Sequence, residues 1–221
     1  MKILFATTNQ AKVRYYATRL QEKGFDIVTL SDLGITQEVE ETGKTPTENA
    51  IIKATSYAQQ AQIPTIAIDE GLYLNGLSPE QQPGVHVRRV NGRRLNDQEM
   101  IEHYLHLVEK YGENGQLTGY FKKGIAVATG NSMTTFENDS PRLFVNRQSE
   151  IIDEGYPLAS IQIVAPVNKF KSELTREEEA ITMDIEQQPI FDFLSQVLEE
   201  IRESIETAQK EKSQSAFCNN L

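Results

Sequence analysis

Tryptophan is absent from this 221-residue chain, and cysteine occurs once, as Cys218. A single cysteine excludes a disulfide within the chain, so the fold has to depend on a packed core, for which this length is sufficient. No apolar run approaches the roughly 20 residues of a membrane-spanning helix, and no apolar signal segment follows Lys2. We therefore expect a cytoplasmic protein without a membrane partner.

Basic residues are in the minority, with 22 Lys and Arg against 32 Asp and Glu and a net charge of −10. This balance argues against a nucleic-acid partner. One basic cluster departs from the trend, because Arg88-Arg89 and Arg93-Arg94 surround Asn91-Gly92. The cluster is either a solvated turn or, at Arg88 or Arg89, a clamp for phosphate.

The N-terminal residues predict an anion site. Lys2–Ala6 is a short apolar strand, and a helix with apolar positions at helical spacing begins near Val13. Between them lies Thr7-Thr8-Asn9-Gln10-Ala11-Lys12. The start of the helix presents free N–H groups and a partial positive charge, to which Lys12 adds a full charge. Thr and Asn are also ordinary helix caps, so this pattern alone does not decide between the two roles.

Carboxylates follow in two places. Glu40 and Glu41 precede a helix whose start is marked by Thr45, Pro46 and Glu48 and which carries Lys53. The apolar run 63–68 predicts a buried strand that ends in Asp69-Glu70-Gly71, with the glycine permitting a turn. Such carboxylates can hold Mg²⁺ together with substrate phosphates, and one of them can orient or deprotonate a water.

The remainder predicts a β-rich region followed by a helix. A helix is expected over 96–111, strands over 119–129, 142–152 and 160–167, and a polar turn-rich stretch over 130–141. A helix with one apolar stripe starts at Pro189, and the residues from Thr207 are polar. We expect a single α/β domain over 1–206, with a β-rich lobe at about 119–167, and a disordered tail over 207–221.

These segments resemble, in order and spacing, the inosine triphosphate pyrophosphatases, which hydrolyse non-canonical purine nucleotides. The matching blocks are Phe5–Val13, Glu40–Thr45 with Glu48–Ala54, Ala67–Leu72, Pro83–Val85 with Arg88-Arg89, and Glu173–Glu178. The resemblance implies an elongated, two-lobed α/β fold with a mixed central sheet flanked by helices. It also implies a homodimer.

The resemblance implies roles for individual residues. The residues that would contact the triphosphate are Thr7, Thr8, Asn9, Lys12 and Lys53. Asp69 and either Glu40 or Glu41 would bind Mg²⁺, and Asp69 would also be the general base. Further substrate contacts would come from Glu70, Arg88, Arg89 and Tyr156.

The chain departs from the family in four places, one of which is the absence of a lysine expected near Glu179. Ile68-Asp69-Glu70 stands where the family has two aspartates and a serine, and Glu154-Gly155-Tyr156-Pro157 replaces an aromatic-glycine-tyrosine-aspartate loop. Met183-Asp184-Ile185 stands where a Ser-His-Arg motif reads the purine oxygen. We therefore expect a weak preference for inosine over adenosine triphosphate, with Asp184 accepting from an exocyclic amine.

Two functions are consistent with these residues. The first is a Mg²⁺-dependent nucleoside triphosphate pyrophosphohydrolase that releases pyrophosphate and a monophosphate. The alternative is a non-catalytic nucleotide-binding sensor or partner protein on the same fold. Asp69 and Lys12 favour the enzyme, whereas the missing Ser-His-Arg counterpart favours the alternative.

Overall fold

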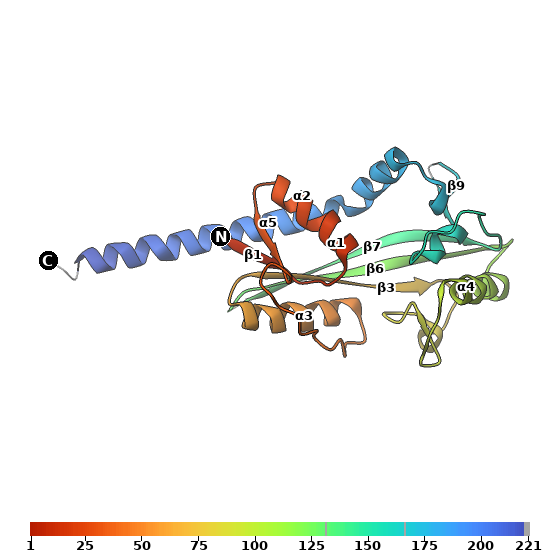
Figure 1. Cartoon of the computed structure of the whole chain (residues 1–221), viewed down its shortest axis with the longest axis horizontal. Coiled ribbons are helices and arrows are strands. Elements are labelled where there is room, and N and C mark those ends of the chain that lie inside the picture. The colour runs from red at the N-terminus through yellow and green to blue at the C-terminus, as the bar shows by residue number, and fades with distance from the viewer. Residues whose placement is uncertain (131, 166, 219–221) are drawn as a thin grey trace.

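A computed structural model describes residues 1–130, 132–165 and 167–218, with side chains as far as residue 211. Within these residues, seven strands form one mixed sheet in the order β2-β1-β3-β6-β7-β8-β9 (Figure 1). Their bounds are β1 (Lys2–Phe5), β2 (Asp26–Thr29), β3 (Thr65–Leu74), β6 (Gln116–Ala128), β7 (Met133–Val145), β8 (Gln162–Val164) and β9 (Lys169–Phe170). β1 is parallel to β2 and β3, and the other pairings are antiparallel. The expected mixed α/β sheet is confirmed.

Helices cover both faces of the sheet (Figure 1). On one face lie α1 (Gln10–Lys12), a π-helical turn (Val13–Ala17), α2 (Thr18–Glu22) and the long α5 (Arg176–Cys218). On the other face lies α3 (Pro46–Ala61). α4 (Asp97–Tyr111) packs Met100 and Ile101 against Leu72 and Leu74 of β3, which point to the same face as Ile66 and Ile68, so α4 lies farther along the face that carries α5. Alternation along the strands supplies a core to each face: Ile66 and Ile68 pack toward α5, and Ala67 packs toward α3.

The other elements are short. A small hairpin, β4 (Arg89–Val90) with β5 (Arg93–Arg94), precedes α4. Three 3₁₀ turns cover Pro79–Gln81, Pro157–Ile161 and Lys171–Glu173. The predicted cap of α3 is confirmed, because Thr45 accepts from the backbone N–H of Glu48. At the start of α4, Asn96 accepts from the backbone N–H of Glu99 in the same way.

β3 does not end where the sequence predicted. It continues through Asp69-Glu70-Gly71 to Leu74 and pairs with β6 along its whole length. Gly71 is needed for a close approach rather than a turn, because a Cβ there would lie 2.7 Å from the carbonyl oxygen of Gly84. Asp69 and Glu70 are therefore consecutive residues inside a strand and point to opposite faces of the sheet.

The β-rich region also differs from the prediction. β7 begins at Met133, inside the stretch expected to be turns, and ends at Val145, before the exposed Ile151 and Ile152. The first half of β7 is largely exposed, which is consistent with its polar side chains. Pairing with β6 along its whole length holds this polar segment as a strand. β6, β7 and β8 belong to the main sheet rather than to a separate one. The strand expected at 160–167 is shortened to β8 by the 3₁₀ turn before it.

α5 begins at Arg176, so Pro189 lies inside the helix rather than at its start. A proline removes one helical hydrogen bond, but Ile190, Phe191 and Leu194 anchor the helix in the core directly after it. The helix continues through 207–218, where we expected a disordered tail, and projects from the body (Figure 1). The residues of that segment are mostly good helix formers.

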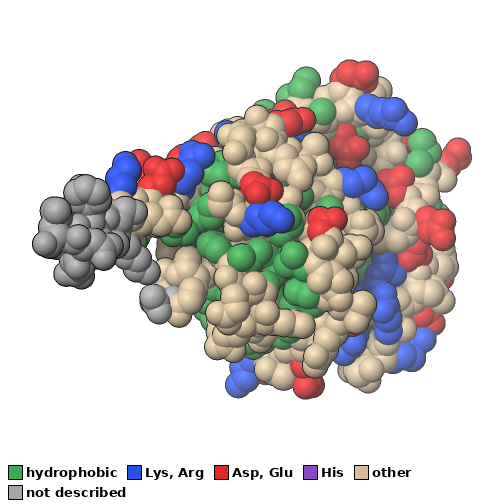
Figure 2. Space-filling model, turned by 60° about the vertical axis from the view of Figure 1, so that its left-hand side comes forward, with side chains coloured by type: hydrophobic (Ala, Val, Ile, Leu, Met, Phe, Trp, Pro, Cys, Tyr) green, Lys and Arg blue, Asp and Glu red, His purple; other side chains and the backbone are tan. Residues whose placement is uncertain are grey.

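The face at the projecting end of α5 carries a broad hydrophobic area with charged side chains around it (Figure 2). Patches of this kind often mark interaction surfaces, and the homodimer stays a prediction. Over the residues that the structure covers, none of the helices combines the length and the apolar character needed to span a bilayer.

Close packing between β6 and α3 gives a stability prediction. A Cβ on Gly124 would lie 2.3 Å from the backbone nitrogen of Thr47, whereas nothing lies within 4 Å of a Cβ on Gly130. We expect Gly124→Ala to lower the free energy of unfolding by about 1–3 kcal/mol or more, because α3 has to shift. Gly130→Ala is the matched control and should leave it almost unchanged. Urea unfolding measures both, and equal stabilities would contradict the packing described.

Candidate active site

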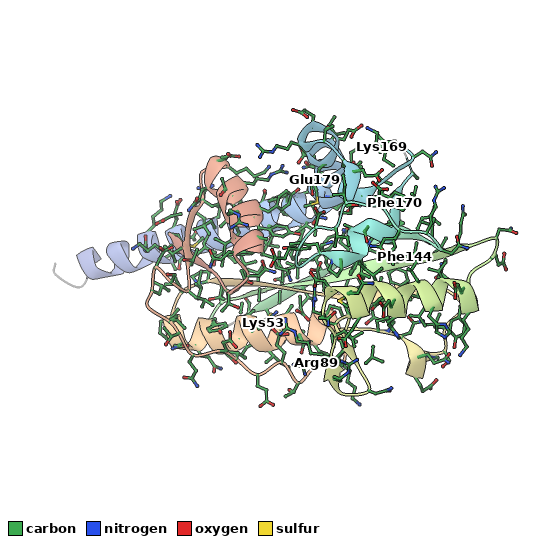
Figure 3. The ribbon with its side chains drawn as sticks, turned by 45° about the vertical axis from the view of Figure 1, so that its right-hand side comes forward. Lys53, Arg89, Phe144, Lys169, Phe170 and Glu179 are labelled. Carbon is green, nitrogen blue, oxygen red and sulfur yellow. The ribbon has the colours of Figure 1, made fainter. Side chains whose placement is uncertain are left out.

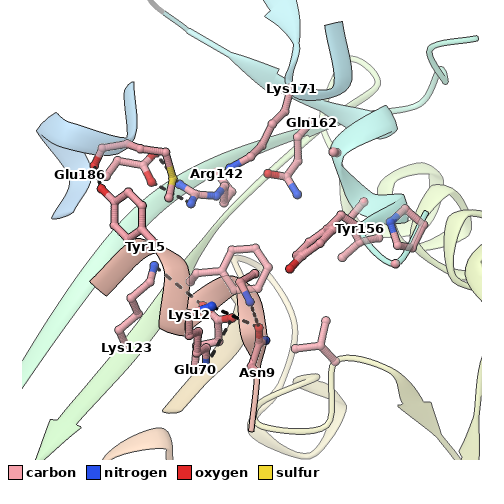
Figure 4. A pocket seen from close by; sticks show the side chains of 18 of the residues that line it. Asn9, Lys12, Tyr15, Glu70, Lys123, Arg142, Tyr156, Gln162, Lys171 and Glu186 are labelled. Atoms are coloured by element: carbon pink, nitrogen blue, oxygen red, sulfur yellow. Dashed lines mark hydrogen bonds and ion pairs between the residues drawn. The ribbon is translucent and has the colours of Figure 1, made fainter. Parts of the chain in front are cut away.

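A cavity of about 370 Å³ opens on the face of the sheet that carries α1 and α5 (Figure 4). Its walls come from elements far apart in the sequence. The polar and charged side chains among them belong to Asn9, Lys12, Tyr15, Tyr16, Glu70, Arg88, Lys123, Arg142, Tyr156, Gln162, Lys171, Glu186 and Gln187. This volume is within the usual range for small-molecule sites.

One end of the cavity is the N-terminal segment predicted to bind an anion. Asn9 caps α1, and its Oδ1 accepts from the backbone N–H groups of Ala11 (2.9 Å) and Lys12 (3.2 Å). The Oγ1 of Thr7 accepts from the backbone N–H of Asn9 (3.1 Å). Asn9 and Lys12 line the cavity, whereas Thr7 and Thr8 are not among its lining residues. The capping role is therefore present, and Lys12 is held at the same point.

Two lysines from opposite faces of the sheet meet at the carbonyl of Ile68. β1 pairs with β3 only at Thr65 and Ile66, so the next part of this edge of β3 is free of β1. The carbonyl oxygen of Ile68 accepts from Nζ of Lys12 (3.4 Å) and from Nζ of Lys53 (3.4 Å). Two ammonium groups therefore lie close together at this edge, and such a concentration of positive charge favours an anionic ligand.

On the α3 face, the ammonium group of Lys53 contacts two of the predicted metal ligands, Glu41 and Asp69. Lys53 is labelled in Figure 3. Its Nζ lies 3.1 Å from Oδ1 of Asp69 and 2.9 Å from Oε1 of Glu41. Oδ2 of Asp69 accepts from Nδ2 of Asn49 (3.1 Å). Glu40 is exposed, and the structure gives it no hydrogen bond or ion pair to any described residue. The geometry thus distinguishes Glu41 from Glu40.

The pair Glu41 and Asp69 suits Mg²⁺. In the described part of the chain, no three His, Cys, Asp or Glu side chains are grouped as a complete metal site. Mg²⁺ is commonly held by one or two carboxylates, with phosphate oxygens and water completing its shell. Two carboxylates with a shared lysine beside a phosphate-type loop fit that donor set.

Glu70 points into the cavity on the other face. Its carboxylate lies 3.9 Å from Nζ of Lys12 and 3.9 Å from Nζ of Lys123. Burial alone would raise the pKa of Glu70, but Lys12, Lys123 and more distant cations hold it below its usual value. Lys123 is only 7% exposed, and burial lowers its pKa. Glu70 is therefore ionised at neutral pH and carries the charge that balances these lysines.

The end of the cavity away from Asn9 and Lys12 is lined by Arg142, Gln162, Lys171 and Glu186 (Figure 4). Arg142 and Glu186 form a two-pronged ion pair, with both N–O distances 2.9 Å. Tyr16 donates to Oε1 of Gln187 (2.5 Å), which ties the π-helical turn to α5. Sequence reasoning missed Lys123, Arg142, Lys171 and Glu186, because they come from four elements with no shared spacing.

The structure places two of the three further predicted substrate contacts at the cavity: Arg88 and Tyr156 line it, and Arg89 does not. Arg88 lines the cavity, but its guanidinium donates to Asp97 (2.6 Å) and to the carbonyl oxygen of Gly155 (2.8 Å). It thereby fixes the loop that carries Tyr156, which is 59% exposed and also lines the cavity. Arg89 lies exposed on β4 and is not part of the lining (Figure 3).

Asp184 is not where the sequence-based expectation required it. Its carboxylate pairs with Arg19 rather than lining the cavity, and Ile185 is 72% exposed. Helix periodicity explains this, because Met183, Glu186 and Gln187 occupy the inward positions of α5. The prediction that Asp184 contacts an exocyclic amine of the base is therefore wrong.

Comparison with known proteins matches both the sequence and the fold. A model of the Ham1 family matches residues 3–150. A dITP/XTP pyrophosphatase of Bacillus subtilis is 34% identical over 79% of this chain and 86% of its own length. A dITP/XTP pyrophosphatase of Yersinia pseudotuberculosis is 33% identical over 80% of this chain and 88% of its own length.

Solved structures show the same fold. A Ham1 protein of Staphylococcus aureus has a TM-score of 0.69 at 24% identity, covering 90% of this chain and 98% of its own. A HAM1 protein of Coxiella burnetii has a TM-score of 0.73 at 25% identity, covering 90% of this chain and 99% of its own.

The environment of Glu70 gives a pH-dependent prediction. Because the pKa of Glu70 is lowered in the folded state, its stabilising effect is complete above the unfolded-state pKa of about 4.3 and is lost as the pH falls through the lower folded value. We expect Glu70→Gln to be less stable than wild type at neutral pH, since Lys12 and Lys123 lose their shared counter-ion. Urea unfolding at neutral pH and at progressively lower pH should show the difference shrinking. A difference independent of pH would contradict this.

Proposed function

The chain belongs to the Ham1 family, and from this premise we propose that it is a Mg²⁺-dependent nucleoside triphosphate pyrophosphatase. It would hydrolyse the bond between the α- and β-phosphates and release pyrophosphate and a nucleoside monophosphate. The observation that carries the proposal is the convergence of Lys12, Lys53, Glu41 and Asp69 around the free edge of β3. The cytoplasmic location, the homodimer and the lack of a nucleic-acid partner stay predictions.

The phosphates would bind where the two lysines meet at the edge of β3. Lys12 and the backbone N–H groups after Asn9 present positive charge at one end of the cavity. Lys53 reaches the same carbonyl from the α3 face. A triphosphate lying along this edge would be contacted from both sides, with Thr7 and Thr8 in the adjoining loop.

Glu41 and Asp69 would hold Mg²⁺, with the substrate phosphates supplying further oxygen ligands. The metal, when bound, neutralises charge on the phosphate oxygens during attack by water. Lys53 keeps the two carboxylates near each other through contacts of 2.9 and 3.1 Å. Asn49 and Lys53 together fix the orientation of Asp69.

Asp69 would act as the general base. Its carboxylate is oriented by two donors among the described residues, Asn49 and Lys53, and it retains lone pairs for a water. No Ser or Cys nucleophile is placed beside it in the described contacts, and attack by water fits this arrangement better than a covalent route. The proton of the attacking water would pass to Asp69 as the oxygen bonds to phosphorus.

The nucleoside would occupy the rest of the cavity, beside Tyr156 and toward Arg142 and Lys171. The relatives from Bacillus subtilis and Yersinia pseudotuberculosis are dITP/XTP pyrophosphatases, which supports a role in removing non-canonical nucleotides. The base would meet side chains from several elements rather than a Ser-His-Arg motif on α5.

A screen for pyrophosphate release separates this function from a non-catalytic nucleotide sensor. The screen uses canonical and deaminated nucleoside triphosphates with Mg²⁺, and the enzyme predicts release with at least one of them. Nucleotide binding without pyrophosphate release from any of them would favour the sensor. The sequence feature that favours this alternative is Ile68, which stands where the family has an acidic residue.

Asp69→Asn should lower the rate by about 10²–10⁴-fold, or further if Mg²⁺ binding is also lost. The amide keeps the shape of the carboxylate but is neither a useful base nor a charged metal ligand. Asp26→Asn, on the exposed start of β2, is the matched control and should keep wild-type turnover. Full activity in Asp69→Asn would show that the base is assigned to the wrong residue.

Glu41→Gln and Glu40→Gln form a second matched pair. We expect Glu41→Gln to raise the Mg²⁺ concentration for half-maximal rate by about tenfold or more, and Glu40→Gln to change it little. Only Glu41 shares Lys53 with Asp69. Titration of the rate with Mg²⁺ measures both variants, and a larger effect in Glu40→Gln would reverse the assignment.

A further inference from the structure

Lys171 is a cavity-lining cation that forms no ion pair with any residue in the described part of the chain. It starts a 3₁₀ turn after β9, and burial lowers the pKa of its ammonium group. Among the residues that the structure describes, its Nζ has no hydrogen bond and no ion pair within 4.0 Å. Lys169, two residues earlier, lies outside the cavity lining and bonds to Glu178 at 2.7 Å (Figure 3).

Glu186, Glu179 and Glu70 are the carboxylates whose charge acts on Lys171, but none of them forms an ion pair with it among the described residues. Glu186 is engaged by Arg142 through both of its oxygens, and Glu70 is shared by Lys12 and Lys123. The Nε of Arg142 is buried and lacks a hydrogen-bond partner in the described part of the chain. This end of the cavity therefore has one unpaired positive charge and an unused donor.

An unpaired charge that is partly withdrawn from water is costly unless a ligand supplies an opposite charge. Lys171 and Gln162 lie side by side at the end of the cavity opposite Asn9 and Lys12 (Figure 4). A triphosphate bound at Asn9 and Lys12 directs the base of the same nucleotide toward Lys171. The negative charge that pairs with Lys171 would then be on the base.

We propose that Lys171 is a specificity-determining residue that binds an anionic oxygen on the base, so the preferred substrates are nucleoside triphosphates with an ionised base. This inference rests on the proposed function for the direction in which the nucleotide lies. Two kinds of base carry such an oxygen: a ring imide that has lost its proton, as in xanthine, and a ring with a carboxylate substituent, as in orotate. Neutral bases of similar shape, hypoxanthine and uracil, lack it. Gln162 adds an amide that can donate to the same oxygen.

The test measures binding of nucleoside monophosphates by titration calorimetry near neutral pH, where the xanthine ring is ionised. Monophosphates are used because their affinity requires neither hydrolysis nor Mg²⁺. The matched pairs are xanthosine against inosine monophosphate and orotidine against uridine monophosphate. The wild-type protein should bind at least one anionic member about tenfold or more tightly than its neutral partner. A preference in the first pair alone indicates an ionised imide, and in the second alone a carboxylate.

Lys171→Met should abolish that preference while leaving affinity for the neutral members within a few-fold, because methionine fills the space without the charge. Lys169→Met is the matched control and should keep the wild-type preference. Thermal unfolding should show Lys171→Met to be at least as stable as wild type, since an unpaired charge has been removed.

The inference is overturned if the wild type shows no preference in either pair, or if the preference persists in Lys171→Met. Its failure is distinguishable from failure of the proposed function. Pyrophosphate release from triphosphates without any charge preference would overturn only the role of Lys171. A charge preference without pyrophosphate release would support Lys171 and contradict the enzyme.

Discussion

The site depends on one geometric constraint: β1 is shorter than β3. Because β1 pairs with β3 only as far as Ile66, the carbonyl of Ile68 lies on an edge that lacks a strand partner. Side chains from both faces of the sheet can reach that edge, and Lys12 and Lys53 do so. The chain leaves the sheet after Phe5 and, after a short loop, enters the helical segment that contributes Lys12, so the same break in pairing frees the acceptor and brings in the cation. A longer β1 would satisfy the carbonyl and close the gap.

Strand alternation divides the acidic residues into two roles. Asp69 faces α3, where Lys53 and Asn49 hold it, and Glu70 faces the cavity, where Lys12 and Lys123 surround it. Each carboxylate has its own cations, so the adjacent charges do not have to share a single site. The substitution that gives this chain a glutamate beside Asp69 is therefore accommodated by basic residues across the cavity.

The sequence predicted local features well and long-range ones poorly. The loop before Lys12 and the capped start of α3 were predictable, because their residue types act within a few positions of one another. The continuation of β3 past Asp69 and the polar half of β7 were not, because pairing with β6 decides them. Arg142, Lys171 and Glu186 meet only after the sheet and α5 have packed, and no spacing along the chain indicates their proximity. The choice of Glu41 over Glu40 likewise required the position of Lys53.

α5 has a consequence for how a ligand enters. The same helix contributes Met183, Glu186 and Gln187 to the cavity and, one turn later, Ile190 and Leu194 to the core. That wall cannot swing outward without disrupting buried packing. The opposite wall, the loop with Tyr156, is fastened to α4 by Asp97 through Gly155 and Arg88. Those polar contacts can break and reform in water at little net cost. A ligand would therefore enter on the side of the loop with Tyr156, because the wall formed by α5 is fixed by buried packing.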